Sequence, residues 1–434
     1  MNLLGSLRAG RRLGCAALLA LVCGTAGAAG PPARASRVAL VAQAETLFAE
    51  GRFAAADTLY AQLLARTPRD TLALKRRGAV ALFHNRVADA RRWYEQALAR
   101  DPANRGFRRQ LAECHRRADR FADAARLERG LGREQRALQL ESFAGRVPYR
   151  ADARTAEVAF VQTDPLPVIQ VSVNGSAPVF FIIDTGGADL VLDTEFADSV
   201  KARRFGADSA TFAAGQRGRV EFGAVDSVSL GGLTVRDVPV EILSTRKFSG
   251  AAGGRRVDGI IGTVFLYHFL PTLDYPAGKL VLRPRDEASR RDLDRSAAED
   301  SAWVVPFWMS GDHYMVARGT INGSEPLLWF VDTGLAGAGF TCPASTLADA
   351  GIDLAKMPSF EGTGGAGKVK VTPFSVDSLT LGPAAQRGVT AFFGPFPPTL
   401  ERGMGYRIGG IISHGFLRRY RMTMDFDGMR YLMR

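Results

Sequence analysis

Two copies of an Asp-Thr-Gly tripeptide are the residues of this sequence best suited to chemistry. They are Asp184-Thr185-Gly186 and Asp332-Thr333-Gly334. Each aspartate directly follows an apolar run, residues 180–183 in the first copy and 329–331 in the second. A strand that is apolar on both faces is buried on both faces, so a carboxylate at its end is costly unless it is hydrogen-bonded or neutralised. Such carboxyls are candidates for acid–base chemistry.

The sequence around the two tripeptides is itself duplicated. Residues 171–186 match 319–334, with Asn-Gly turn signals that make each apolar run a returning strand. A Val-Asp-Ser block and a Gly-Ile-Ile block then recur in the same order, the latter at 259–261 and 410–412. The Gly-Ile-Ile block follows each aspartate at a nearly equal separation. Three blocks at a nearly constant offset predict a duplicated β domain.

This constellation resembles the aspartic proteases, and the first copy, residues 184–192, is closest to the retropepsin-like branch. The resemblance implies a bilobal fold, with one lobe at 155–285 and the other at 301–434, each contributing one Asp-Thr-Gly loop. It makes Asp184 and Asp332 the expected catalytic residues. Thr185 and Thr333 would brace the two loops against each other. Gly186 and Gly334 would leave room for the substrate backbone.

The chemistry that the resemblance implies is the hydrolysis of peptide bonds. Two carboxylates a few ångströms apart in a water-poor cleft cannot both ionise cheaply, so the pair holds one proton. The ionised oxygen takes a proton from a water, which attacks the peptide carbonyl, while the other carboxyl protonates the carbonyl oxygen. No cofactor is needed. The five histidines are dispersed and no CxxC or HExxH spacing occurs, so we also expect no metal site.

Glycine-rich turns just before the two Val-Asp-Ser blocks are candidate flaps over the cleft, and plain flexible turns are an equally good interpretation. The glycines concerned are Gly215, Gly218, Gly364 and Gly365. Three residues depart from the family pattern: Gly187, Leu335 and Ser413. Leu335 cannot hydrogen-bond the carboxyls. The competing hypothesis is therefore a catalytically idle scaffold that binds peptides or proteins.

Residues 37–135 are rich in Ala, Leu, Arg and Glu with apolar positions at helical spacing. The segment 51–68 recurs at 85–102, and a third copy begins at Leu111 and carries Glu128 where a tyrosine would stand. These residues, and the spacing at which they recur, resemble tetratricopeptide repeats, with an ordinary helical bundle as the alternative. The fold class expected for the whole chain is thus multidomain, with helical repeats followed by an all-β, aspartic-protease-like part.

The net charge of +12 belongs mainly to the helical segment. Residues 34–150 carry 24 basic and 13 acidic side chains, whereas 151–434 carry 29 and 31. We therefore expect no nucleic-acid partner. The expected partners are a peptide or protein substrate and a protein bound at the helical repeats. The repeat arginines would lie on solvated helix faces or meet an acidic partner.

The N-terminus has the order of a secretory signal. Three arginines up to Arg12 precede an apolar run at 13–22, which small residues follow as far as Ala29. Residues 1–28 are predicted to be a cleaved signal peptide, with a retained membrane anchor as the alternative. No other stretch is long and apolar enough to span a membrane. The expected location is the bacterial periplasm.

Overall fold

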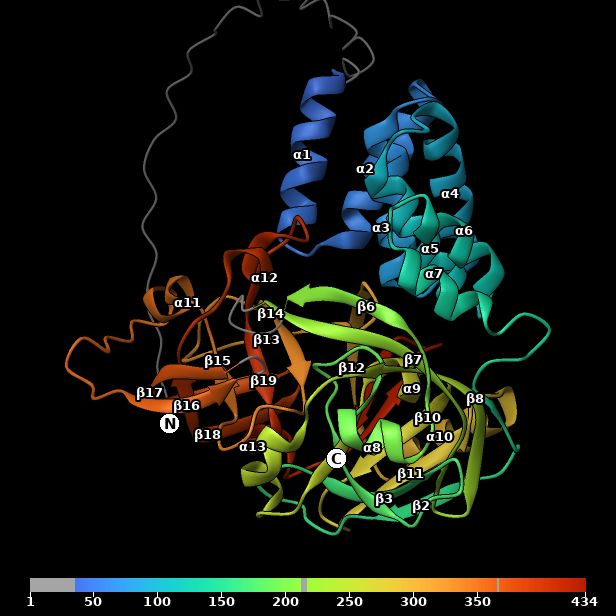
Figure 1. Cartoon of the computed structure of the whole chain (residues 1–434). Coiled ribbons are helices and arrows are strands. Elements are labelled where there is room, and N and C mark those ends of the chain that lie inside the picture. The colour runs from blue at the N-terminus through green and yellow to red at the C-terminus, as the bar shows by residue number, and fades with distance from the viewer. Residues whose placement is uncertain (1–35, 212–216, 365–366) are drawn as a thin grey trace, which may run out of the picture. The chain divides into compact units, whose positions relative to one another are not determined.

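The computed structural model describes residues 36–211, 217–364 and 367–434, and its described part starts with helices (Figure 1). The expected signal segment, 1–28, lies outside these residues. None of the described helices is both long and apolar enough to cross a membrane. The helices that precede the first strand are α1 Arg37–Ala49, α2 Phe53–Arg66, α3 Thr71–Phe83, α4 Val87–Arg100, α5 Arg105–Arg117, α6 Phe121–Arg129 and α7 Glu134–Glu141.

The period found in the sequence is also a period of the backbone. Helices α1, α3 and α5 begin at equal intervals along the chain, and α2, α4 and α6 begin at the same interval. The turn inside each pair contains one residue in the left-handed region, at Gly51, Asn85 and Asp119, with φ of 71°, 53° and 53°. These positions carry glycine, asparagine and aspartate because those residues tolerate positive φ. The prediction of N-terminal helical repeats is confirmed.

Large and small side chains fit between the repeat helices. Tyr60 and Tyr94 are fully buried at equivalent positions. The ring of Tyr94 lies so close to Gly78 that a Cβ there would be 2.8 Å from it. At the third equivalent position Glu128 is also fully buried and pairs with Arg116. The last repeat therefore replaces an apolar contact with a buried ion pair.

The first β unit is a six-stranded barrel. Its strands run in the order β8-β5-β9-β4-β3-β7, and a β7–β8 pairing closes the ring. The strand β6 extends from β7 as a hairpin, and the short β1, Arg150–Ala151, pairs with β8. The bounds are β3 Val168–Val173, β4 Val179–Ile183, β5 Leu190–Leu192, α8 Thr194–Ser199, β6 Arg203–Thr211, β7 Arg217–Leu230, β8 Leu233–Ile242, η2 Arg246–Ala252, β9 Val257–Ile261 and α9 Thr263–Tyr267.

The second β unit repeats this order of strands. Its strands follow the sequence β17-β18-β15-β19-β14-β13, and an isolated bridge between Ile321 and Leu379 joins the segment after β13 to β17. In both units the strand before Asp-Thr-Gly lies parallel to the Gly-Ile-Ile strand. The bounds are β13 Tyr314–Gly319, β14 Leu327–Asp332, β15 Phe340–Thr341, α11 Ala344–Asp349, β16 Phe360–Gly364, β17 Gly367–Leu381, β18 Ala384–Phe393, α12 Pro398–Arg402, β19 Ile408–Ser413 and α13 His414–Leu417.

A further run of antiparallel strands joins the two units. Its order is β12-β21-β20-β10-β11-β2, so each unit contributes three strands. At its centre Thr272 of β10 faces Thr423 of β20, and their buried hydroxyls are 2.7 Å apart. The bounds are β2 Ala156–Ala159, β10 Phe269–Asp274, β11 Lys279–Pro284, α10 Glu287–Glu299, β12 Trp303–Ser310, β20 Arg421–Asp425 and β21 Arg430–Met433.

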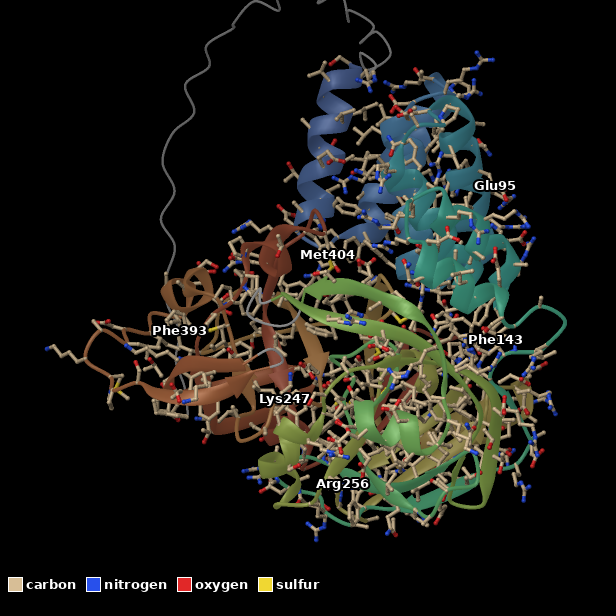
Figure 2. All side chains as sticks on the ribbon, in the orientation of Figure 1. Glu95, Phe143, Lys247, Arg256, Phe393 and Met404 are labelled. Atoms are coloured by element: carbon tan, nitrogen blue, oxygen red, sulfur yellow. The ribbon has the colours of Figure 1, made fainter. Side chains whose placement is uncertain are left out.

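The helical repeats pack against both β units, and residues 37–434 form one compact unit. Side chains of α1–α3 share a hydrophobic cluster with β13, β14 and β19, and Met404 borders it. Side chains of α6 and α7 belong to the main core, which includes Phe143. Figure 2 shows Met404 and Phe143 at these two junctions. The sequence analysis had treated the repeats as a separate domain, and nothing in their periodicity indicated this packing.

Gly259 provides a test of how the Gly-Ile-Ile strand packs. A Cβ at Gly259 would overlap the Phe181 ring and lie 2.6 Å from the Val191 carbonyl oxygen. We expect Gly259→Ala to lower the free energy of unfolding in urea by about 1–3 kcal/mol, because the neighbours are a packed ring and backbone. The control is Gly250→Ala, which has nothing within 4 Å. Equal effects of the two substitutions would contradict this packing.

Candidate active site

The structure brings Asp184 and Asp332 together although they lie far apart in the sequence. Each stands at the end of a barrel strand, after β4 and at the end of β14, and each is half-buried. A Cβ added to Gly186 would be 2.5 Å from the carboxyl atoms of Asp332. A Cβ on Gly334 would overlap the carboxyl of Asp184. Both glycines therefore provide the space in which the two carboxyls meet.

The two Asp-Thr-Gly loops have the same local geometry. The Gly186 N–H donates to Asp184 Oδ1 at 2.8 Å, and the Gly334 N–H donates to Asp332 Oδ1 at 2.7 Å. In each loop one carboxyl oxygen of the aspartate thus accepts a hydrogen bond from the backbone N–H of the glycine two residues later. This leaves the other oxygen of each carboxyl for the partner carboxyl or a bound molecule.

Four hydrogen bonds that involve Thr185 and Thr333 join the loops. The Thr185 hydroxyl donates to the Val331 carbonyl at 3.1 Å and accepts from the Thr333 N–H at 3.1 Å. In the same way the Thr333 hydroxyl donates to the Ile183 carbonyl and accepts from the Thr185 N–H, both at 3.0 Å. Both threonines are fully buried. The arrangement fixes the distance between the aspartates that precede them.

Burial makes full ionisation of the carboxyl pair unfavourable. Desolvation raises the pKa of Asp332 well above its ordinary value, and the charge of Asp184 raises it further. Desolvation also raises the pKa of Asp184, but hydrogen bonds from Asp332 and the Gly186 N–H and the charge of His313 act in the opposite direction. The pair therefore holds one proton over a range of pH.

Ser413 is a site residue whose role sequence reasoning missed. It stands where the first unit has Gly262, and the sequence analysis treated it only as a departure from the family pattern. Its hydroxyl donates to the Asp332 carbonyl and accepts from the Leu335 N–H at 3.1 Å. In the first unit the Thr263 hydroxyl donates to the Thr185 carbonyl at 2.9 Å. A hydroxyl thus holds each loop, from different positions of the two units.

Tyr275 also lies in the surroundings of the dyad, the carboxyl pair formed by Asp184 and Asp332. Burial raises the pKa of its hydroxyl, and the charge of Asp332 contributes. Within the described residues this hydroxyl has no hydrogen-bond partner. The corresponding residue of the second unit is Phe426. Because both residues are aromatic, the sequence pattern did not distinguish a polar neighbour of the dyad from a core position.

The flap candidates are only partly described. Gly218 belongs to β7 and pairs with Ala210, and Gly364 ends β16 and pairs with Gly367. Both therefore lie in the hairpins β6–β7 and β16–β17. Gly215 and Gly365 lie outside the described residues.

No group of three or more His, Cys, Asp or Glu side chains in the described ranges is placed to hold a metal ion. Residues 169–265 match the family model described as aspartyl protease. This segment runs from β3 into α9 and includes the first Asp-Thr-Gly motif. No curated protein matches the chain. The family match supports a protease-like hydrolase.

The threonine hydrogen bonds can be tested by unfolding. Thr185→Val removes a hydroxyl and leaves the Val331 carbonyl and the Thr333 N–H unpaired in a buried place. We expect the free energy of unfolding in urea to fall by about 2–4 kcal/mol. The control, Thr58→Val, alters an exposed hydroxyl on α2 and should change it by less than about 0.5 kcal/mol.

The protonation of the pair predicts how stability depends on pH. The pKa of Asp332 is higher in the folded than in the unfolded protein, so the folded protein binds more protons. Proton binding at Asp332 therefore contributes fully to the free energy of unfolding below about pH 4, and this contribution is lost as the pH rises. Asp332→Asn cannot ionise and so does not lose this stability. The difference in melting temperature between Asp332→Asn and the wild type should therefore grow in favour of the variant as the pH rises above about 4. The exposed Asp226→Asn serves as control, and a difference that is constant with pH would contradict the raised pKa of Asp332.

Proposed function

We propose that this chain is an aspartic endopeptidase that hydrolyses peptide bonds with a water activated between Asp184 and Asp332. The observation that carries the proposal is the pair of carboxyls, each held by its own glycine N–H and fixed by reciprocal threonine hydrogen bonds. A single buried carboxylate would suggest a structural role. Two that share a proton form an acid and a base in one site.

The two carboxyls of the singly protonated pair take complementary roles. The ionised carboxyl takes the proton of a water that attacks the peptide carbonyl. The protonated carboxyl gives its proton to the carbonyl oxygen as negative charge develops there. When the intermediate breaks down, one carboxyl protonates the leaving amine and the other takes a proton from a hydroxyl of the intermediate, so the pair is again singly protonated.

The two β units, with their equivalent order of strands, support a retropepsin-like type in which both lobes lie in one chain. Their hairpins β6–β7 and β16–β17 are the proposed flaps, which would cover an extended peptide in the cleft. The proposed protease lobes remain 155–285 and 301–434.

We further propose that the helical repeats are of the tetratricopeptide type and that they contact a substrate or a protein partner. The regular interval between successive helical pairs, together with the tyrosine and glycine packing between helices, supports this type. The proposal that the protein is exported, to a bacterial periplasm, rests on residues 1–28, whose order of arginines, apolar run and small residues is typical of a signal peptide.

Activity is tested by incubating the full chain with a peptide library between about pH 4 and 7. We expect cleavage by the wild type and a loss of about a thousandfold or more in Asp184→Asn and Asp332→Asn, since each removes one half of the acid–base pair. Asp226→Asn is the matched control and should retain full activity. Cleavage that survives in both dyad variants would contradict the mechanism.

The second candidate function is a scaffold that binds peptides without cleaving them. Leu335 favours it, because this side chain follows the second Asp-Thr-Gly motif and offers no hydrogen bond to the carboxyls. In the same assay, peptide binding by the wild type without cleavage would support the scaffold and overturn the peptidase.

A further inference from the structure

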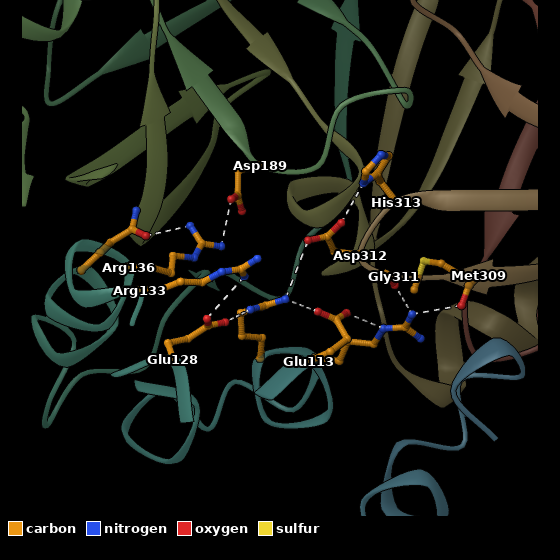
Figure 3. Close-up of polar contacts among 12 residues, drawn as sticks. Glu113, Glu128, Arg133, Arg136, Asp189, Met309, Gly311, Asp312 and His313 are labelled. Carbon is orange, nitrogen blue, oxygen red and sulfur yellow. Dashed lines mark hydrogen bonds and ion pairs between the residues drawn. The ribbon is translucent and has the colours of Figure 1, made fainter. Parts of the chain in front are cut away.

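Helix α7 is the part of the helical repeats that reaches into the first β unit. Its Gln139 and Leu140 are buried, and the helix belongs to the main core. The neighbouring α5 meets the turn between β12 and β13 instead. There Arg117 donates to the Met309 carbonyl at 3.0 Å and also to the Gly311 carbonyl (Figure 3). The repeats therefore hold a turn of the second unit through α5 and reach the first unit through α7.

The amide of Gln139 binds between two strands of the first barrel. Its Nε2 donates to the Gly223 carbonyl at 2.6 Å and to the Val240 carbonyl at 2.9 Å. These two residues face each other in β7 and β8, so the amide binds both strands at one level of the sheet. The Oε1 of Gln139 accepts from Arg136 Nη1 at 2.7 Å. Gln139 therefore orients the guanidinium of Arg136.

Arg136 makes the contact between α7 and the segment that follows Asp184. Its Nη2 lies 2.9 Å from Asp189 Oδ2, and the two side chains are 11% and 5% exposed (Figure 3). Asp189 also has an acidic neighbour on β8, because burial raises the pKa of Glu241 and the charge of Asp189 raises it further. Loss of the arginine would leave Asp189 as a buried charge without a cation, which is costly.

Asp189 ends the first catalytic loop, residues 184–189. Two N–H groups at the start of α9 donate to carbonyls of this loop at 3.0 and 2.9 Å, Thr263 to Gly187 and Val264 to Ala188. The loop is thus held by α9, which belongs to its own barrel, and at its end by Arg136, which belongs to the repeats.

Helix α7 also contacts the hairpin β6–β7, the proposed flap of the first unit. Gly206 of β6 has a φ of 104° and lies at an irregularity in the pairing of β6 with β7. A Cβ there would be 2.5 Å from the Cγ of Gln135. On β7 the ring of Phe222 lies under the guanidinium of Arg136, 5.3 Å from its centroid to the guanidinium carbon. One helix therefore contacts both the first catalytic loop and the hairpin.

The second unit has no counterpart of this ion pair. In the duplicated sequence Gly337 stands at the position of Asp189, so the loop after Asp332 offers no carboxylate there. The divergence lies at one position of two otherwise similar loops. It makes the first loop the one that depends on the repeats.

We propose that Arg136 is a positioning residue of the active site, which fixes the end of the first catalytic loop from α7 while the same helix supports the hairpin β6–β7. The inference rests on the proposed peptidase function and extends it, because it makes the helical repeats part of the catalytic apparatus. Arg136 acts through Asp189 and touches no reacting atom.

The first test is Arg136→Gln in the full chain, with Arg136→Lys as the conservative variant. Glutamine leaves Asp189 without a cation. We expect kcat to fall by about tenfold while KM stays within about twofold, because a small displacement of a reacting group lowers the rate more than it weakens binding. Lysine keeps the positive charge and should recover most of the lost kcat.

The matched control is Arg318→Gln, which should leave kcat unchanged. Arg318 of β13 also joins a β unit to the repeats, since it donates to the carbonyls of Glu50 and Gly51 at 3.3 and 3.0 Å. An equal loss of kcat in the control would show that any disturbance of the junction has this effect, and it would overturn the specific role of Arg136.

A double-mutant cycle tests whether Arg136 acts through Asp189. Asp189→Asn should lower kcat by a factor similar to that of Arg136→Gln. Because both substitutions break one ion pair, the variant that combines them should lose no more than the larger of the two single losses. Losses that multiply would contradict the ion pair as the route.

Amide hydrogen exchange, followed by NMR, gives a readout that does not depend on cleavage. The N–H groups of Thr263 and Val264 should exchange about tenfold faster in Arg136→Gln than in the wild type, and at the wild-type rate in Arg318→Gln. If the wild type cleaves nothing, the peptidase proposal fails, while this exchange still decides whether Arg136 fixes the loop. Unchanged exchange in Arg136→Gln would overturn the inference. If thermal melts show that this variant does not fold, the same measurement on Asp189→Asn decides it.

Discussion

One proton shared between two half-buried carboxyls is the constraint on which the rest of this structure depends. The charges of Asp184 and Asp332 would repel each other in a desolvated place, and separation of the loops would relieve that cost. The loops stay together because Thr185 and Thr333 satisfy each other's backbone groups. The two β units and the strands that join them hold these loops in register. A large part of the tertiary structure therefore positions the carboxyl groups of these two aspartates.

The helical repeats pack against both β units rather than forming an independent module. They place Arg116 and Arg117 against the turn between β12 and β13, and they share hydrophobic clusters with both β units. Buried arginines are costly unless every donor is satisfied, and Glu113, Glu128 and three backbone carbonyls satisfy most of these. The sequence analysis had expected these two arginines on a solvated face or at an acidic partner. In the structure their partners are residues of the same chain.

Local sequence patterns predict much of the architecture. The internal period of the N-terminal segment predicted the helical repeats, because each repeat is one helical pair whose turn needs a residue tolerant of positive φ, such as Asn85 or Asp119. The alternation of apolar runs with Asn-Gly turns predicted β structure, because those residues favour hairpins. The duplicated blocks singled out Asp184 and Asp332, because an aspartate after a doubly apolar strand requires an explanation. All of these signals act over a few residues or repeat regularly along the chain.

Only the tertiary structure decided which distant residues meet. The contact of Arg117 with Gly311 spans 194 positions, and no periodicity records it. In the same way the sequence indicated only that Ser413 replaces a glycine of the family pattern, whereas in the structure its hydroxyl hydrogen-bonds both the Asp332 carbonyl and the Leu335 N–H. The sequence by itself determined the types of element and the pair of acids, because propensity and burial pattern are local. The surroundings of the two acids depend on long-range packing, which exists only once the chain is folded.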